Sequence, residues 1–175
     1  MVRPAAGAAE VAASGRVVQA AYAEFGPGSA HGIPGWAAYE REQGDAAARA
    51  RDALVLVVMD EADPRAEVLG TATLYLAPTR HSEHWRAGDA VVRFLAVLPA
   101  ARGRGIGQAL LDACIRLAVE AGRPRLALHT TAPMATAAAM YQRAGFVPDP
   151  AGDLWVGDFA IRAFALDLPP AQSSS

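Results

Sequence analysis

One stretch of the sequence, residues 91–107, combines a strand, a break and the start of a helix around three glycines. It reads VVRFLAVLPAARGRGIG, an apolar run ended by a proline and followed by an arginine-glycine loop. Successive backbone N–H groups in a loop that glycine permits, opening onto a helix N-terminus, form an anion site that needs no lysine. The pattern Arg102-x-x-Gly105-x-Gly107 therefore predicts a site for a pyrophosphate, to which Arg102 and Arg104 add positive charge.

Two other glycine loops do not fit this pattern. A Walker loop ends in Gly-Lys-Ser or Gly-Lys-Thr, whereas Gln108 and Ala109 follow Gly107 here. A dinucleotide loop needs a third glycine where Gln108 stands, and an acid about twenty residues further on, where the chain offers none. A plain alternative stays open, in which the glycines only allow tight packing at a strand-to-helix turn.

The composition limits the class of protein. A chain of 175 residues, 53% of them hydrophobic, suits one domain with a buried core. Its longest apolar run, Ala53–Met59, is too short to span a membrane, and the N-terminal residues lack the apolar centre of a signal peptide. A formal net charge of −2 argues against nucleic-acid binding, and the single Cys114 excludes an internal disulfide. We therefore expect a cytoplasmic protein that binds neither membrane nor nucleic acid, with Cys114 as a small core residue.

The hydrophobic pattern predicts helices and strands in mixed order. We expect helices over Ala8–Phe25, Trp36–Arg51 (with a break near Gly44-Asp45), 105–122 and Ala135–Ala144, and strands over Ala53–Met59, Glu67–Leu76, 91–98, Arg125–Thr130 and Phe159–Leu168. The first two strands form an antiparallel hairpin in this scheme. The predicted fold is α/β: a single domain over 8–168 with a mixed, mostly antiparallel sheet of six or seven strands, helices on both faces, and a disordered tail over 169–175.

This order of elements, with the glycine loop between a strand and a long helix, closely resembles the GNAT superfamily of acyl-CoA-dependent N-acetyltransferases. The run Phe94–Pro99 is similar to the family's strand before the loop. The segment Ala137-x-x-Met140-Tyr141-x-x-x-Gly145-Phe146 is similar to its late helix and turn. The resemblance covers about residues 8–168.

The resemblance implies direct transfer of an acetyl group from acetyl-CoA to a primary amine of a small molecule or peptide. The pantetheine arm would lie along the strand as an added strand, and the pyrophosphate would lie on the loop amides. Tyr141 would protonate the departing thiolate, and a strand amide near Val97 would hold the oxyanion. The residues that the resemblance assigns to the cofactor are Leu95, Ala96, Val97, Arg102, Gly103, Arg104, Gly105, Ile106, Gly107, Met134 and Tyr141.

Two departures from the family pattern concern the site. Met134 stands where many members carry an asparagine that contacts the cofactor. The strand before the loop offers no acid as general base, so the base must come from elsewhere or from water. The candidates are Asp89, Glu83, His81, His84 and His129. Each also has a plain interpretation as a surface, turn or strand-end residue.

Other functions stay open beside the acetyltransferase. The missing acid and Met134 favour a non-catalytic acyl-CoA-binding regulatory module, whereas Tyr141 argues against it. An unrelated phosphate-binding domain is a third alternative. The spacing of His81 and His84 suggests a metal pair, but no third ligand is evident, so we expect no metal. The acceptor is not specified by the sequence, and the resemblance leaves a homodimer open.

Overall fold

The structure is a computed structural model that describes residues 1–26, 35–60, 67–79 and 85–170. The strands are β1 (Val2–Pro4), β2 (Leu54–Met59), β3 (Val68–Tyr75), β4 (Ala90–Val97), β5 (Arg125–Thr131), β6 (Val147–Pro148), β7 (Leu154–Val156) and β8 (Phe159–Asp167). The α-helices are α1 (Ala8–Tyr22), α2 (Trp36–Gly44), α3 (Ala46–Arg49), α4 (Ile106–Glu120) and α5 (Ala135–Arg143). Short 3-10 turns are η1 (Ala23–Phe25), η2 (Pro99–Ala101), η3 (Ala132–Met134) and η4 (Pro150–Gly152).

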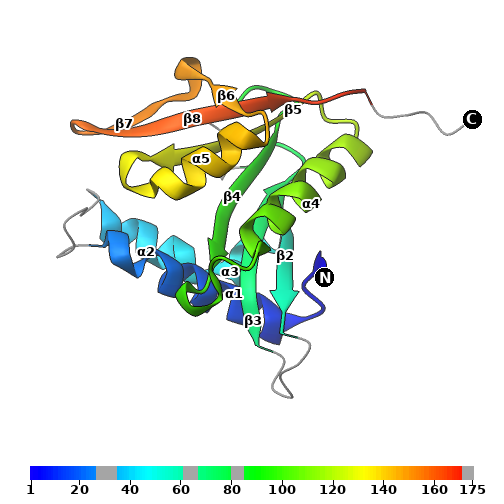
Figure 1. The fold of residues 1–175 in the computed structure, drawn as a ribbon, viewed down its shortest axis with the longest axis vertical. Coiled ribbons are helices and arrows are strands. Elements are labelled where there is room, and N and C mark those ends of the chain that lie inside the picture. Colours follow the sequence, from blue (N-terminus) through cyan, green and yellow to red (C-terminus); the bar gives the residue numbers. More distant parts are fainter. Residues whose placement is uncertain (27–34, 61–66, 80–84, 171–175) are drawn as a thin grey trace, which may run out of the picture. The chain divides into compact units, whose positions relative to one another are not determined.

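The strands join in one mixed sheet. Their order is β1-β2-β3-β4-β5-β8-β6, and β7 pairs with β8 (Figure 1). The chain divides into two compact units, the first formed by Met1–Leu74 and Phe94–Ala113, the second by Tyr75–Arg93 and Cys114–Ser175. Each of β4 and α4 begins in one unit and ends in the other. A single domain over 8–168 stays a prediction.

In the first unit, the predicted hairpin is present and carries a bulge. β2 and β3 pair antiparallel, with Val58 opposite Gly70 but Met59 opposite Val68, so that one extra residue lies on β3. Because successive side chains alternate between faces, this extra residue turns Val68 to the face that Val57 occupies. The bulge thereby adds Val68 to the core on that face.

Both faces of this part of the sheet are covered. On one face, Val17, Val18 and Ala21 of α1 form a buried cluster with Val57, Val68, Phe94 and Ala96. On the other face, the beginning of α4 lies so close to β3 that a Cβ on Gly70 would come within 2.6 Å of Ile106 Cγ2 and 3.2 Å of Leu110 Cδ1. The absence of a side chain at Gly70 therefore sets how closely α4 approaches the strand.

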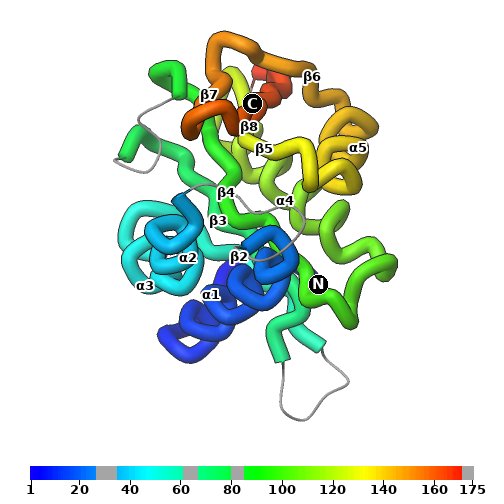
Figure 2. Tube along the Cα trace, turned by 90° about the vertical axis from the view of Figure 1, so that its left-hand side faces the viewer, coloured from blue at the N-terminus to red at the C-terminus, as the bar shows by residue number. Residues whose placement is uncertain are grey.

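In the first unit, α1 lies against α2 and α3 (Figure 2). The break predicted near Gly44-Asp45 is confirmed, because Asp45 ends α2 and begins α3. The Asp45 carboxylate accepts a hydrogen bond from the Ala48 N–H at 3.0 Å, which is a regular N-cap. At the start of α1, the Glu10 carboxylate accepts from the Ala6 N–H at 2.7 Å and so satisfies a donor just before the helix.

In the second unit, β5 is flanked by unlike neighbours. It pairs in parallel with β4 over Ala90–Val92 and antiparallel with β8 along its whole length (Figure 1). A parallel pair needs a crossover connection, and α4 supplies it along the chain. β6 and β7 add short antiparallel pairings to β8.

The helix that follows the glycine loop, α4, ends at a glycine. At the end of α4, Gly122 has a φ of 65°, and the N–H groups of Gly122 and Arg123 donate to Val119 and Ala118. These paired bonds around a left-handed glycine form a Schellman motif, which ends the helix close to the predicted bound at residue 122. Within α4, Cys114 is buried, and this desolvation raises the pKa of its thiol to about 12. It is thus a core residue, as predicted, and not a nucleophile.

The predicted fold class is confirmed, as a mixed and mostly antiparallel sheet with flanking helices. The sheet has eight strands in the described part of the chain, where six or seven were expected. The strands that lie outside the five predicted ranges are the short edge strands β1, β6 and β7, each of at most three residues. Among the described residues, no helix is long and apolar enough to cross a membrane.

Candidate functional site

The strand before the glycine loop changes direction at Phe94. The ladder between β4 and β5 covers Ala90–Val92, and two residues later Phe94 has a φ of 52°. Phe94 has the one positive φ among the non-glycine residues that the structure describes. Left-handed backbone at a bulky residue is strained, and it interrupts the regular pleat of β4.

Beyond Phe94, the backbone groups of β4 alternate between two directions. The Leu98 N–H donates to the Leu69 carbonyl of β3 at 2.9 Å, and a Cβ on Gly70 would meet the Ala96 carbonyl at 3.3 Å. Because alternate residues of a strand direct their N–H and C=O groups to opposite sides, those of Val97 and Leu95 are directed away from β3. Of the three residues predicted to contact pantetheine, Leu95 and Val97 thus direct their backbone groups away from β3, whereas the backbone of Ala96 is turned to β3.

The loop over 102–105 owes its shape to its glycines. Gly103 and Gly105 have φ values of 77° and 76°, which residues with a side chain rarely adopt. A Cβ on either glycine would meet nothing within 4 Å, so tight packing does not explain them. α4 then begins at Ile106, and its first intrahelical bond at this end joins the Ala109 N–H to the Gly105 carbonyl at 3.0 Å. The N–H groups that precede Ala109 lie at the helix N-terminus, where an anion is stabilised.

The two arginines of the loop are both exposed. Arg102 Nη2 donates to Glu24 Oε1 at 2.7 Å and to the Ala21 carbonyl at 3.1 Å. An exposed ion pair of this kind contributes about 0–1 kcal/mol, so a phosphate can displace Glu24 at little cost. Arg104 is also exposed, close to the helix N-terminus.

Tyr141 and Met134 lie in the second unit, at the two ends of α5. Met134 is the half-buried N-cap residue. At the other end, Gly145 has a φ of 92°, and the Phe146 N–H donates to the Tyr141 carbonyl at 3.0 Å. This is a second Schellman motif, in which the buried Tyr141 ring packs against Phe146 at a centroid distance of 6.0 Å. The spacing Tyr141-x-x-x-Gly145-Phe146 therefore has a structural reason independent of catalysis.

Asp89, a predicted candidate base, lies in a buried group of charges in the second unit. Its carboxylate accepts hydrogen bonds from Arg125 Nε at 3.1 Å and Arg125 Nη2 at 2.7 Å. Arg125 Nη1 donates in turn to Asp149 at 2.7 Å, and Asp149 also accepts from Arg86. The hydrogen bond to Asp89 raises the pKa of the Arg125 guanidinium, which keeps its charge. These bonds favour a structural role for Asp89, because a base must offer a lone pair to the substrate.

The remaining candidate bases are placed differently. Glu83, His81 and His84 lie outside the described residues. His129, on β5, has Nε2 at 2.8 Å from the Gly152 carbonyl oxygen. Its ring centroid lies 4.2 Å from that of Trp85. The carbonyl can only accept, so this contact assigns the hydrogen to Nε2 and makes Nδ1 the basic nitrogen.

A group of residues around Phe94 was not predicted from the sequence. The Tyr39 ring stacks on Phe94 at 5.7 Å, the Arg49 guanidinium lies 4.3 Å from the Phe94 centroid, and the Tyr22 hydroxyl donates to the Leu95 carbonyl at 3.3 Å. These side chains come from α1, α2 and α3. Their spacing in the sequence carries no motif, because three separate helices bring them together at one strand.

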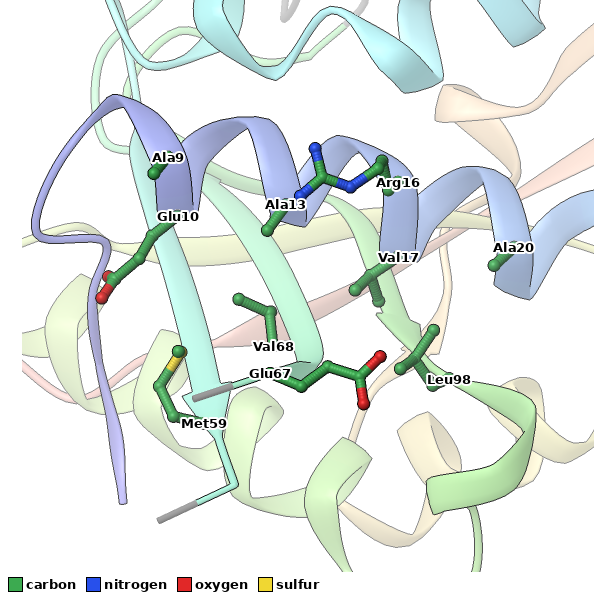
Figure 3. A pocket seen from close by; sticks show the side chains of 10 residues that line it. All are labelled: Ala9, Glu10, Ala13, Arg16, Val17, Ala20, Met59, Glu67, Val68 and Leu98. Carbon is green, nitrogen blue, oxygen red and sulfur yellow. The ribbon is translucent and has the colours of Figure 1, made fainter. Parts of the chain in front are cut away.

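The first unit also contains a cavity of about 650 Å³ beside α1. Alanines and other small or apolar side chains form most of its wall, and Arg16, Glu10 and Glu67 add charge (Figure 3). None of the residues predicted to contact the cofactor lines this cavity. We assign it no part in the candidate site.

The comparisons with known proteins agree with these features. The family model described as acetyltransferase (GNAT) family matches residues 18–146. No curated protein sequence is significantly similar to this chain.

Solved structures with the same fold are numerous but distant in sequence. A GNAT acetyltransferase from Staphylococcus aureus Mu50 is 15% identical with a TM-score of 0.70, covering 97% of this chain and 99% of its own. A phosphinothricin acetyltransferase from Sinorhizobium meliloti, in complex with AcCoA, is 18% identical with a TM-score of 0.61, covering 99% and 94%. The ribosomal-protein-S18-alanine N-acetyltransferase from Escherichia coli is 18% identical with a TM-score of 0.60, covering 100% and 96%.

Proposed function

Since this chain belongs to the acetyltransferase (GNAT) family, we propose that it transfers an acetyl group from acetyl-CoA to a primary amine of a small molecule or a peptide. One observation carries the proposal: a strand in which the backbone groups of Leu95 and Val97 are directed away from β3 leads directly into a glycine loop and a helix N-terminus. The first part suits the amides of a pantetheine arm, and the second suits a pyrophosphate.

Main-chain groups supply most of the binding in this proposal. Leu95 and Val97 pair with the pantetheine amides, while the N–H groups over 102–107 bind the phosphate oxygens. Arg104, and Arg102 once it leaves Glu24, neutralise the remaining charge. Binding holds the thioester in one orientation against β4, and such positioning of two reactants lowers the barrier by several kcal/mol.

The acetyl transfer itself uses two groups of this chain. The Val97 N–H stabilises the oxyanion that develops when the amine adds to the thioester carbonyl. The Tyr141 hydroxyl donates its proton to the departing thiolate sulfur. Because an ordinary phenol has a pKa of about 10 and an ordinary thiol about 8.5, this transfer is uphill by only about 2 kcal/mol. Cys114 is buried, so no acyl-enzyme forms at its thiol.

The attacking amine must first lose a proton. The bonds between Asp89 and Arg125 argue against Asp89 in this role, which leaves Glu83, His81, His84, His129 and water. Substitution of each of these four side chains by Gln separates them: the variant that removes the base lowers kcat at neutral pH and recovers as the pH rises and the amine deprotonates unaided. If no variant does so, water is the base.

The acceptor is a separate question. Two structural neighbours are named for unlike acceptors, one for phosphinothricin and the other for the alanine of a ribosomal protein. Both are amines, so a panel of amino acids, polyamines, aminoglycosides and peptide N-termini covers the chemistry. CoA release, followed with a thiol reagent, identifies the acceptor.

The glycine loop provides the decisive test of cofactor binding. Gly105→Glu places a negative charge and a side chain among the loop amides, and we expect it to abolish acetyl-CoA binding in calorimetry. Gly157→Glu is the matched control, since Gly157 also has a positive φ of 60° and open space around its Cβ. Gly157→Glu introduces the same backbone strain and the same charge outside the glycine loop. Unchanged affinity in Gly105→Glu would overturn the proposal.

Turnover distinguishes the enzyme from the non-catalytic module. A protein that binds acetyl-CoA in a manner sensitive to Gly105→Glu, yet releases no CoA with any amine of the panel, would be the regulatory module. The Tyr141 hydroxyl favours the enzyme, because a binding module has no use for a proton donor at the sulfur.

A further inference from the structure

The strained backbone at Phe94 is held by contacts that the proposed chemistry does not explain. A left-handed φ at a bulky residue costs free energy and persists only where the surroundings enforce it. The Phe94 side chain is buried, with 4% of its surface exposed. Its neighbours therefore determine whether the strand keeps its change of direction.

Arg49 is one of these neighbours, and it is itself held in place. Only 1% of its surface is exposed, and its guanidinium lies 4.3 Å from the Phe94 ring centroid. Arg49 Nη2 donates to the Gln43 carbonyl at 3.1 Å and Nη1 donates to the Glu42 carbonyl. A cation bonded to carbonyls at a helix C-terminus is favoured by the helix dipole, and a desolvated cation beside an aromatic face is favoured again.

Two tyrosines complete the contacts. Tyr39 stacks on Phe94 at 5.7 Å with an interplanar angle of 27°, and on Tyr22 at 6.3 Å. The Tyr22 hydroxyl then donates to the carbonyl of Leu95, the residue after Phe94. These contacts thus link the Phe94 ring, through Tyr39 and Tyr22, to the orientation of the Leu95 carbonyl. The carbonyl oxygen has a second lone pair, so it can still accept from a ligand.

We infer that Arg49, Tyr39 and Tyr22 are positioning residues, which hold the left-handed turn at Phe94 and so direct the backbone of Leu95 and Val97 toward the pantetheine arm. The inference rests on the proposed function, since it assigns a purpose to the strand only if acetyl-CoA binds there. It does not involve the glycine loop, whose conformation depends on its own glycines. The two parts of the cofactor should consequently respond separately to substitution.

The experiment compares two ligands by calorimetry: CoA, and adenosine 3′,5′-diphosphate, which carries the nucleotide end without the pantetheine arm. The variants are Arg49→Met, which keeps the aliphatic part of the side chain but removes the guanidinium group and its charge, and Tyr22→Phe, which removes only one hydroxyl. We expect CoA to bind about three- to thirtyfold more weakly, as for other substitutions that act through an intermediate element, with adenosine 3′,5′-diphosphate unchanged. Arg49→Lys retains the charge and should recover part of the CoA affinity.

Arg51→Met is the matched control, since Arg51 lies two residues further on and is exposed. It should bind both ligands like the wild type. Tyr22→Phe retains its ring contacts, so it keeps the inference testable if Arg49→Met does not fold. Unchanged CoA affinity in folded Tyr22→Phe and Arg49→Met, or an equal loss for both ligands, would overturn the inference alone. Failure of the wild type to bind CoA would instead overturn the proposed function, and with it this inference.

Discussion

In the proposed mechanism, Tyr141 serves structure and chemistry with different atoms. Its backbone carbonyl and ring belong to the Schellman motif with Gly145 and Phe146. The hydroxyl is not part of that motif. A substitution that removes only the hydroxyl therefore separates the two roles.

We expect Tyr141→Phe to lower kcat about tenfold to a thousandfold, which is near the range for the loss of a general acid. The melting temperature and the affinity for acetyl-CoA should stay close to the wild-type values, because the ring remains. Steady-state kinetics with a verified acceptor and calorimetry measure these effects. Full turnover in the variant would show that the thiolate leaves without this proton.

At the same scale, the sequence could indicate the site's backbone residues but not their supports. Gly103 and Gly105 stand in a recognisable spacing because only a few residue types tolerate a positive φ. Phe94 also has a positive φ, but no glycine at this position indicates it in the sequence. Arg49 and Tyr22 act on the strand from other helices, and such tertiary contacts leave no local pattern.

At the scale of elements, the buried charges at the start of β4 and β5 bind three segments of the second unit together. Arg125 on β5 bonds to Asp89, just before β4, and to Asp149, just after β6. Removing one partner from a buried ion pair leaves the other without compensation. We therefore expect Asp89, a candidate base in the sequence, to stabilise the fold rather than to act as the base.

Asp89→Asn should destabilise the protein by about 1–3 kcal/mol, because hydrogen bonds to a charged partner are lost or weakened. Denaturant unfolding measures the change, and Asp112→Asn is the control, since Asp112 is exposed and bonds only to Gln108 on its own helix among the described contacts. The folded variant should retain turnover. A hundredfold loss of kcat with unchanged stability would instead make Asp89 the base.

A second link joins β1 to α1. Arg3 donates to both Glu10 carboxylate oxygens at 2.7 and 2.8 Å. This side-chain bond, together with the Ala6 N–H, lowers the pKa of Glu10 from 4.5 to about 2. A carboxyl whose pKa is lowered on folding adds stability above its unfolded pKa, and the gain disappears as the pH falls through the folded pKa.

The stability difference between wild type and Glu10→Gln should therefore be constant at neutral pH and shrink between pH 4.5 and 2. Thermal unfolding at a series of pH values measures it. Arg3→Met should cost less in the Glu10→Gln background than in the wild type, because the two side chains share one interaction. A difference that persists at pH 2 would contradict the assignment.

Long helices and strands were predicted from the sequence, whereas the shortest ones were not. α4 was predicted within two residues because its apolar stripe and its Gly122 stop agree. The edge strands β1, β6 and β7 were missed, since three residues or fewer show no period. The bulge at Val68 was missed as well, because the extra residue is defined by its partner strand.

For the molecule as a whole, the predicted contacts with acetyl-CoA can be tested in each compact unit by itself. The residues over 95–97 and 102–107 belong to the first, whereas Met134 and Tyr141 belong to the second. Binding should therefore slow amide hydrogen exchange in both, and ligand at a hundredfold over Kd should add about 2.7 kcal/mol of stability. Protection confined to the first unit would remove Met134 and Tyr141 from the set of contacts.

The glycine loop also bears on how such a chain can diverge over evolutionary time. Every residue except proline carries a main-chain N–H, so a binding surface made of these groups survives most replacements of the side chains around it. Drift in residues 102–107 should be limited at Gly103 and Gly105, where the backbone angle decides, and tolerated far better at the arginines. The fold itself tolerates extensive replacement of side chains, since solved structures that share it are only 15–18% identical to this chain.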